Sequence, residues 1–240
     1  MNIVRFTLSG KFGHFLRAEA NANGVTYPVP PRTVLLGLVG AVLGLGKDTP
    51  QQLLADARLA VGGELPKRFW HKTNIRKDPP APLPVQVKKT DKGSSSEQRN
   101  FRFPQEYLWK PRYQVWAALP VPYHSDLAAR LQERRWHYTP CLGLSELLAD
   151  LSDAFEFEAV LLPAGIHRVS TVIPQEVVSK LDMATACDDG LTLQALRMPV
   201  SATADRVFSH RAYWVEHKGK PFPVETKEAW QVGSEVVVFL

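Results

Sequence analysis

The sequence predicts an α+β fold, in which a ferredoxin-like N-terminal domain carries a long inserted arm and is followed by a β-rich C-terminal region. Hydrophobic periodicity in residues 1–162 gives the order strand, helix, strand, strand, helix, strand. A basic stretch at 64–112 interrupts that order between the second and third strands, so it would project from the sheet. The last ninety or so residues are mainly strand-like. RNA-recognition motifs are built on the same plan.

The composition is that of a folded domain: 240 residues, of which 45% are apolar and 22% charged. The longest apolar stretch, 34–45, is too short for a membrane span, which requires roughly 20 residues. The chain opens directly into strand-like sequence and not into a secretory leader. Its two cysteines, Cys141 and Cys187, lack the spacing of a zinc site or a disulfide framework. We therefore expect a cytoplasmic protein without membrane contact, metal or cofactor.

The first predicted elements are a strand and a glycine-containing helix. Residues 2–9 alternate between apolar and polar, which predicts a half-buried strand. A loop with several glycines and prolines follows at 10–31. Residues 32–45 have apolar positions spaced as on one face of a helix. Glycines such as Gly37 and Gly40 are unfavourable inside a helix, so we expect close approach to the sheet to offset their cost.

A short helix and the strands of the arm come next. Thr49 begins a capping box with proline at the first helical position, which predicts a helix to about residue 56. A short strand follows at 58–61. Residues 67–72 are strand-like, and residues 101–112 are rich in aromatic and basic side chains. These two stretches would form the two sides of the arm.

The remaining elements complete the predicted fold. We expect a strand at 113–119, a helix capped by Ser125 and ending near residue 136, and a short helix at 145–151. Lys218 and Gly219 would form a hairpin tip. The strands expected after these helices are 155–162, 167–173, 191–198, 206–216 and 235–240.

These elements divide the chain into two parts. Residues 1–139 would form the ferredoxin-like core, with the arm inserted at about 64–112. Residues 140–240 would hold the last ferredoxin-like strand and the β-rich region.

The positive charge of the chain is concentrated in the arm. Residues 64–112 contain 12 Lys and Arg against 5 Asp and Glu, a net charge of +7. The rest of the chain has 17 basic and 19 acidic side chains, a net charge of −2. Such a concentrated positive field attracts a polyanion. A solvated basic loop on an otherwise neutral protein is the alternative.

Aromatic residues are interleaved with the cations of the arm. Cations neutralise phosphates, while aromatic rings stack on unpaired bases, so the combination favours single-stranded RNA over duplex DNA. Alternatively, the rings anchor the arm to the domain and the cations are only solvated. The candidate RNA-binding residues of the arm are Arg68, Trp70, His71, Lys72, Arg76, Lys77, Arg99 and Arg102. Further members of the same set are Lys88, Lys89, Lys92, Lys110, Arg112, Phe69, Phe101, Phe103, Tyr107 and Trp109.

The first loop offers a second group of candidates. Lys11, His14, Arg17 and Arg32 bracket its glycines and prolines, and glycines allow a phosphate chain to approach the backbone. Arg17 could equally pair with Glu19 in a structural ion pair. The residues alone leave both interpretations open.

Two stretches of this sequence resemble a known family. They read Gly10-Lys11-Phe12-Gly13-His14-Phe15-x-Arg17 with Thr26-Tyr27-Pro28-Val29-Pro30-Pro31-Arg32-Thr33-x-x-x-Gly37-x-x-Gly40-Ala41-x-Leu43-Gly44, and Tyr138-Thr139-Pro140-x-Leu142-Gly143-Leu144-Ser145-Glu146. This pattern is similar to the fifth family of CRISPR-associated (Cas) proteins, of the RAMP superfamily, which caps the 5′ handle of guide RNA in type I Cascade complexes. The match covers the N-terminal forty or so residues and one short central stretch.

The resemblance implies a fold, partners and an activity. The fold would be a ferredoxin-like domain with a thumb hairpin that wedges between guide nucleotides, followed by a smaller β-rich region. The partners would be the crRNA, the Cascade backbone subunits and the large subunit, with target DNA reached only through the complex. Most members bind RNA without cutting it, whereas one branch is a metal-independent endoribonuclease. The tyrosine–proline–proline stretch here is similar to the binding branches.

Metal-independent cleavage of repeat RNA is therefore the alternative function. It requires a base for the 2′-hydroxyl and an acid for the leaving oxygen. His71, Lys72 and Tyr107 in the arm and His14 in the first loop would supply these groups, but their spacing is unspecific. We expect an RNA-binding subunit that is not an enzyme. A protein-interaction module whose basic arm meets an acidic partner is a further alternative.

Overall fold

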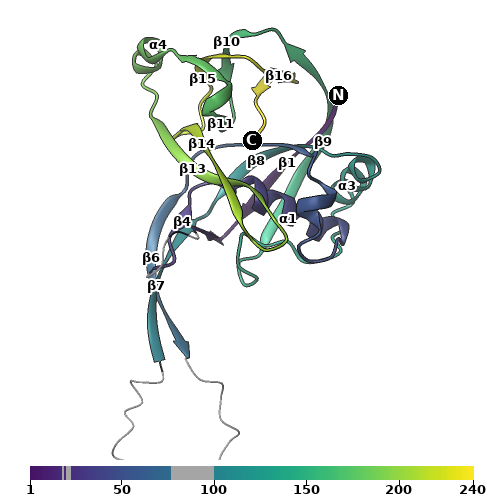
Figure 1. Cartoon of the computed structure of the whole chain (residues 1–240), viewed down its shortest axis with the longest axis vertical. Helices are drawn as coiled ribbons and strands as arrows, with labels where there is room; N and C mark the ends of the chain where they lie inside the picture. Colours follow the sequence, from purple (N-terminus) through teal and green to yellow (C-terminus); the bar gives the residue numbers. More distant parts are fainter. Residues whose placement is uncertain (18, 20–22, 77–99) are drawn as a thin grey trace, which may run out of the picture.

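A strongly curled sheet forms the body of the protein, and a hairpin projects from it (Figure 1). The computed structural model describes residues 1–17, 19, 23–76 and 100–240. Among these, nine strands lie in one sheet in the order β12 (Val178–Leu181), β15 (Phe222–Thr226), β10 (Gly165–Val169), β17 (Glu235–Val237), β16 (Ala229–Val232), β9 (Ala149–Leu162), β1 (Asn2–Gly10), β8 (Arg112–Ala118) and β5 (Arg58–Gly62). The fold is thus α+β and rich in strands, as predicted.

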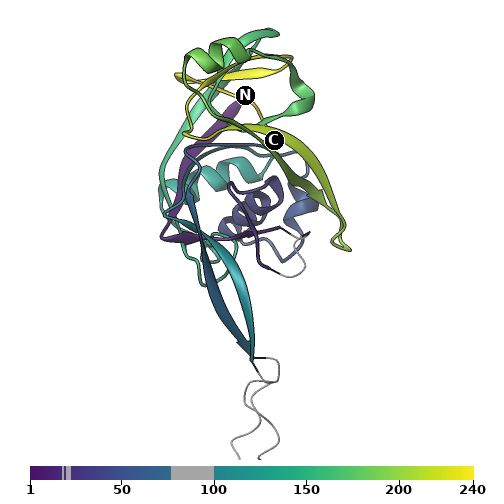
Figure 2. The ribbon, with the colours of Figure 1, turned by 90° about the vertical axis from the view of Figure 1, so that its left-hand side faces the viewer.

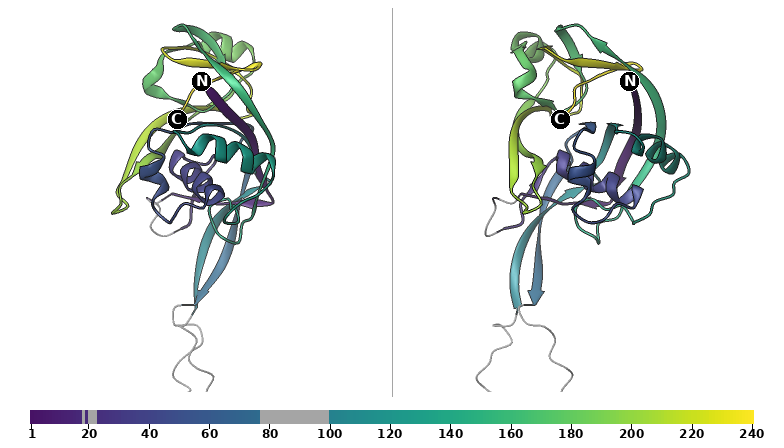
Figure 3. Two further views of the ribbon diagram at one scale, coloured as in Figure 1. Left: turned by 90° about the vertical axis from the view of Figure 1, so that its right-hand side faces the viewer. Right: turned by 45° about the vertical axis from the view of Figure 1, so that its right-hand side comes forward.

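The N-terminal part of this sheet is antiparallel and carries helices on one face. Neighbouring strands in the order β9-β1-β8-β5 are antiparallel, with Val4 opposite both Ala117 and Glu156. Alternate residues of β1, among them Val4 and Phe6, are buried in a core shared with α1 (Arg32–Leu43) and α3 (Tyr123–Gln132). The face of β1 that carries Val4 and Phe6 therefore packs against two helices. Figure 3 shows both helices on the same side of the sheet.

The opposite face of β1 is also covered, because the sheet curls over itself. Ile3, Trp116 and Val232 are buried in a second core, which β16 and β17 close from the C-terminal side. The strand β9 is long enough to pair with β1 at one end and with β16 at the other. Figure 2 shows the C-terminal strands above the N-terminal part.

Smaller sheets complete the architecture. β14 (Phe208–Glu216) lies between β11 (Ile173–Pro174) and β13 (Leu193–Ala202), and β3 (Phe15–Leu16) pairs with β4 (Thr26–Tyr27). The short helices are α2 (Pro50–Leu53) and α4 (Met183–Asp188), together with a single 3₁₀ turn, η2 (Gln175–Val177). Within the described ranges, no helix combines the length and apolar character that crossing a bilayer requires.

Two predicted helix caps differ from the structure. Thr49 itself has helical backbone angles, and its hydroxyl donates to the carbonyl oxygen of Gly46 at 2.7 Å, so no capping box forms and the helix ends at Leu53. Ser125 lies inside α3, which follows Pro122 and ends at Gln132. In both cases a proline at the helix start replaces the side-chain cap.

Three further predictions from local sequence are wrong. Residues 145–151 form turns and the beginning of β9 in place of a helix, because β9 continues its pairing with β1 back to Ala149. The stretch 167–173 is split between β10 and β11, which belong to different sheets. Lys218 and Gly219 form a turn, but β14 and β15 on either side of it do not pair, so the turn connects two sheets and is not a hairpin tip.

The glycines of α1 face neighbours other than the sheet. A Cβ at Gly40 would lie 2.3 Å from Cγ of Pro50 in α2, whereas a Cβ at Gly37 would meet nothing within 4 Å. Of these two glycines, only Gly40 is required by a close approach, and the element that it approaches is α2 and not the sheet.

This difference predicts opposite effects of two alanine substitutions in one helix. Gly37→Ala should raise the free energy of unfolding by about 0.5–1 kcal/mol, since alanine is the better helix former. Gly40→Ala should lower it by about 1–3 kcal/mol because Pro50 must move. Urea denaturation of both variants measures the difference, and equal effects would contradict the packing of α1 on α2.

Candidate nucleic-acid interface

The arm is a two-stranded hairpin that leaves the body at its lower edge (Figure 1). Its strands are β6 (Lys67–Arg76) and β7 (Asn100–Trp109), which pair over their whole described length, from Lys67 opposite Trp109 to Arg76 opposite Asn100. The strand-like character predicted for 67–72 is confirmed, and most of 101–112, which the sequence indicated only as aromatic and basic, belongs to the second strand.

Strand alternation separates the side chains of the hairpin into two faces. On one face, which we call the basic face, lie the exposed Arg68, Lys72 and Arg102, with Trp70 between them and 55% exposed. On the other, the aromatic face, lie Phe69, His71, Tyr107 and Trp109. Because directly opposed residues of antiparallel strands share a face, the cross-strand register fixes this separation.

The aromatic face contains a cluster of rings at the root of the hairpin. β2 (Phe12–Gly13) pairs with the end of β7 and places Phe12 at 5.3 Å from Trp109 and 5.7 Å from Phe69, measured between ring centroids. Tyr107 stacks on Phe69 at 5.8 Å and lies 6.0 Å from His71. Phe12, Phe69, His71 and Tyr107, together with Leu147, line a hollow of about 280 Å³. The rings thus anchor the arm and also leave a concave apolar surface.

A buried carboxylate fixes the root of the arm on its basic face. Oε2 of Glu106 accepts from the backbone N–H of Thr26 at 3.1 Å, and Oε1 lies 3.5 Å from the guanidinium of Arg68. The backbone N–H of Glu106 donates to the carbonyl oxygen of Gly24 at 2.7 Å. These contacts join β7 to the first loop, and Glu106 was not among the residues that the sequence indicated.

His14 belongs to this root and is not available to a ligand. Its side chain is buried, and Nδ1 lies 2.7 Å from the carbonyl oxygen of Glu106. Its backbone N–H donates to the carbonyl oxygen of Leu142 at 2.9 Å. The prediction that His14 contacts RNA is therefore corrected: the histidine is a structural residue between the first loop and the arm.

Arg32 is also used inside the protein. Its guanidinium donates to the carbonyl oxygens of Ala55 at 2.6 Å and Ala57 at 2.9 Å. A third bond, to the carbonyl oxygen of Val200 at 3.3 Å, ties it to β13. Since three carbonyls share this half-buried cation, Arg32 joins α1 to the segment before β5, and its contact with RNA stays a prediction.

The other predicted residues of the first loop are exposed. Lys11 lies at the turn between β1 and β2, with Nζ 5.6 Å from the ring centroid of Phe12. Arg17 stands over the ring of Tyr27 at 5.3 Å. Glu19, the predicted structural partner of Arg17, instead contacts Tyr27 and His210. Of the arm residues, Lys77 and Arg99 lie outside the described residues, and only the backbone of Arg76 is described.

Burial of His14 predicts that stability falls in mild acid. Burial lowers the pKa of His14 below its usual 6.5, and burial also lowers the pKa of His124. The unfolded chain therefore binds more protons as the pH falls through about 6.5, so the free energy of unfolding decreases from there downward. Melting temperatures between about pH 8 and pH 5.5 measure this decrease.

The matched variants His14→Gln and His124→Gln separate the two contributions. Each should make the decrease in melting temperature smaller than in the parent protein, because each removes one group that gains a proton on unfolding. A decrease in His14→Gln as steep as in the parent protein would contradict the assignment to His14.

Three of the four groups proposed for RNA cleavage lie around Tyr107, whose ring centroid is 5.9 Å from that of His14 and 6.0 Å from that of His71. His71 and Lys72 point to opposite faces of the hairpin, and His14 is buried. Of these groups, His71 and Tyr107 share the aromatic face and line the same hollow. Among the residues that the structure describes, no three His, Cys, Asp or Glu side chains gather closely enough to hold a metal ion.

Comparisons with known proteins place the chain in a wider context. The sequence profile of a family described as CRISPR-associated protein (Cas_Cas5) matches residues 3–161. A search of curated proteins finds no match. A solved structure described as a CRISPR RNA-guided surveillance complex is similar, with a TM-score of 0.54 at 18% identity over 92% of this chain and 91% of that one.

A second solved structure is a CRISPR protein from Archaeoglobus fulgidus. It has a TM-score of 0.58 at 15% identity, over 100% of this chain and 99% of that one. At such identities both structures show that the curled, strand-rich fold is shared along the whole chain.

Proposed function

Because this chain belongs to the family of CRISPR-associated proteins described as Cas_Cas5, we propose that it is the crRNA-binding subunit of a type I Cascade effector complex. In this role it caps the 5′ handle of the guide RNA in the cytoplasm and nucleates assembly with the backbone and large subunits. Target DNA is reached only through the assembled complex, in antiviral defence.

The two-faced hairpin is the observation that carries this proposal. Lys72 and Arg102 are exposed cations on the basic face, and Trp70, which lies between Arg68 and Lys72, is exposed as well. Cations with an accessible ring suit a single strand, whose bases are free to stack. The remaining cations of the first loop, Lys11 and Arg17, are also exposed.

We also infer that the first part of the chain is a ferredoxin-like domain. The antiparallel order β9-β1-β8-β5, with α1 after β1 and α3 after β8, supports this inference. Residues 67–109 of the arm then enter between the second and third strands of that domain, and the boundary near 139 remains a prediction.

Binding without cleavage is the activity we propose. The burial of His14 and the placement of Lys72 on the opposite face support it, because a cutting site would then have to use His71 with Tyr107 alone. Incubation of the purified protein with CRISPR repeat RNA in EDTA tests this directly. We expect the RNA to be bound and to remain intact, and a defined cut would replace the proposal with the endoribonuclease alternative.

A binding measurement tests the proposal itself. Fluorescence anisotropy with labelled repeat RNA should show binding whose affinity decreases as the salt concentration rises, since phosphate contacts release counterions. Failure to bind repeat RNA at low salt would contradict the proposed function. It would favour the interaction module with an acidic partner.

A further inference from the structure

A second hollow, distinct from the ring-lined one, lies where the arm joins the body. It has a volume of about 290 Å³ and is lined by Lys67, Trp109, Lys110 and Arg112, with 64–66 as its remaining wall. The three cations are exposed, and Trp109 is 44% exposed. None of these residues is among those that hold the root of the arm on its basic face.

The backbone presents Lys110 in an unusual conformation. Lys110 has a φ of 46°, in the left-handed region that favours glycine, and its N–H donates to the carbonyl oxygen of Lys11 at 3.0 Å. This turn redirects the chain from β7 into β8. Lys110 thus occupies a position where glycine would be easier to accommodate, and its Nζ lies 5.6 Å from the ring centroid of Trp109.

Two of the three cations of this hollow have no ion pair among the described residues. Among the ion pairs of the described residues, Arg112 has Asp153 at 3.6 Å, while Lys67 and Lys110 have none. Glu64 is the acidic member of the lining.

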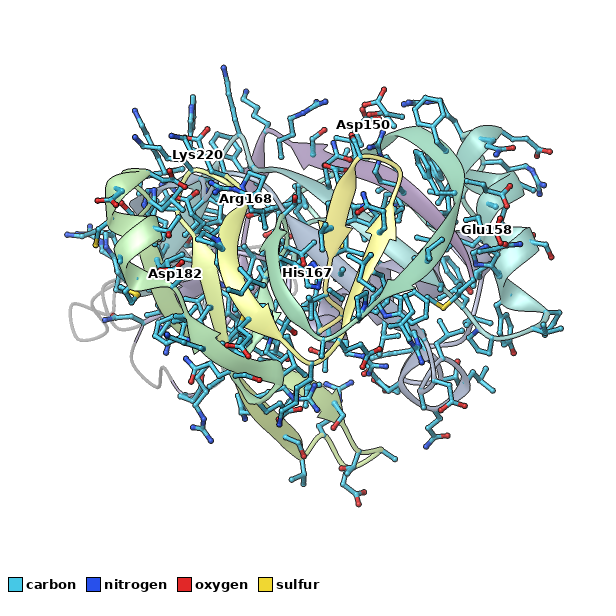
Figure 4. The ribbon with its side chains drawn as sticks, turned by 90° about the horizontal axis from the view of Figure 1, so that it is seen from above. Asp150, Glu158, His167, Arg168, Asp182 and Lys220 are labelled. Carbon is cyan, nitrogen blue, oxygen red and sulfur yellow. The ribbon has the colours of Figure 1, made fainter. Side chains whose placement is uncertain are left out.

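A neighbouring turn adds two more cations. The carbonyl oxygen of His217 accepts from the backbone N–H of Leu65 at 2.9 Å, so the turn at 217–220 lies against the wall of the hollow. Its backbone is held by Glu216, which accepts from the N–H groups of Lys218 and Lys220 at 2.8 Å each. Seen from above, Lys220 lies at the same end of the body as Arg168 and far from Glu158 (Figure 4).

We propose that this hollow is a nucleotide-binding subsite for single-stranded RNA. It would hold a phosphate between Lys67, Lys110 and Arg112 and stack a base on Trp109. The inference rests on the proposed function, and it adds a contact outside the basic face of the arm. Trp109 is two residues from Tyr107 on the same face of β7. This subsite and the ring-lined hollow would therefore bind neighbouring nucleotides of one RNA strand.

The exposed ring favours a nucleotide over an acidic protein segment. One face of Trp109 is approached by Nζ of Lys110 at 5.6 Å, an exposed cation–π contact, which is weak. A base can replace the ammonium on that face, and the ammonium is then free to meet the phosphate. An acidic peptide would use the cations but would gain nothing from stacking.

Three substitutions in the full chain test the subsite with labelled oligouridylate of about ten nucleotides. Lys110→Gly should bind several-fold more weakly and make the salt slope shallower by roughly 0.7, the value for one lost phosphate contact on a single strand. Its melting temperature should be unchanged or higher, because glycine suits the left-handed backbone. Trp109→Leu should bind roughly tenfold more weakly, while Trp109→Phe should keep most of the affinity.

The outcomes separate this inference from the proposed function. If the parent protein binds neither oligouridylate nor repeat RNA, the proposed function fails. If the parent protein binds and either Lys110→Gly or Trp109→Leu binds equally well, the subsite is overturned while the arm remains the binding element. Binding of polyglutamate that is lost in Lys110→Gly, while that variant binds RNA as tightly as the parent protein, would assign the hollow to an acidic protein instead. Lys227→Glu, at an exposed site between β15 and β16, is the charge control.

Discussion

Reversing two charges on the basic face, Lys72→Glu with Arg102→Glu, is expected to weaken binding of repeat RNA roughly a hundredfold. Both side chains are exposed on the hairpin and point to the same face. Each lost contact between a cation and a phosphate should cost about 1.5 kcal/mol, the lower end of the range for hydrogen bonds to charged groups. The salt slope should also become shallower by about 0.7 for each contact. Anisotropy titrations at several salt concentrations measure both quantities.

Folding should not change in this double variant, because substitutions of exposed residues usually alter stability by less than about 0.5 kcal/mol. Arg68 is left out deliberately, although the sequence favours it equally. A glutamate there would face the buried Glu106 and would confuse loss of binding with loss of structure. The pair Lys180→Glu with Lys227→Glu, both exposed in the C-terminal region, applies the same charge change elsewhere. Equal losses in the two double variants would indicate a general charge effect and not a binding face.

The hydrophobic pattern of the sequence predicted the first strand and the first long helix. The alternation of 2–9 and the helical spacing of 32–45 both correspond to observed elements, although β1 is buried on both faces and most residues of α1 are buried. The helix expected at 145–151 is absent because Leu147 and Leu151 fit a helix as well as a strand. Leu151 lies opposite Leu8 in the sheet, a pairing between residues far apart in sequence, and that pairing decided the outcome.

The sequence predicted which residues form the candidate site, but not which other residues they contact. Arg68, Trp70 and Lys72 are spaced two apart, so the alternation of side chains along a strand is enough to place them on one face. The burial of His14 and the internal hydrogen bonds of Arg32 could not be predicted from such a spacing. Their partners, Glu106 and the carbonyls of Ala55 and Ala57, come close only once the chain has folded.

Glu106→Ala is expected to lower the free energy of unfolding by about 2–3 kcal/mol. The change would leave the buried N–H of Thr26 without its acceptor, and an orphaned buried donor costs about 1–3 kcal/mol. The loss of the Arg68 contact adds little, since Arg68 is 47% exposed and such pairs contribute roughly 0–1 kcal/mol. Urea denaturation followed by tryptophan fluorescence measures the change.

Glu106→Gln is the matched variant, and it separates the acceptor from the charge. The amide oxygen can still accept from Thr26, so this variant should lose no more than about 1 kcal/mol, the value of the half-exposed ion pair. If glutamine is as destabilising as alanine, the negative charge itself holds the root of the arm, and the hydrogen bond from Thr26 contributes little. If glutamine is tolerated, the arm is positioned by a neutral hydrogen bond.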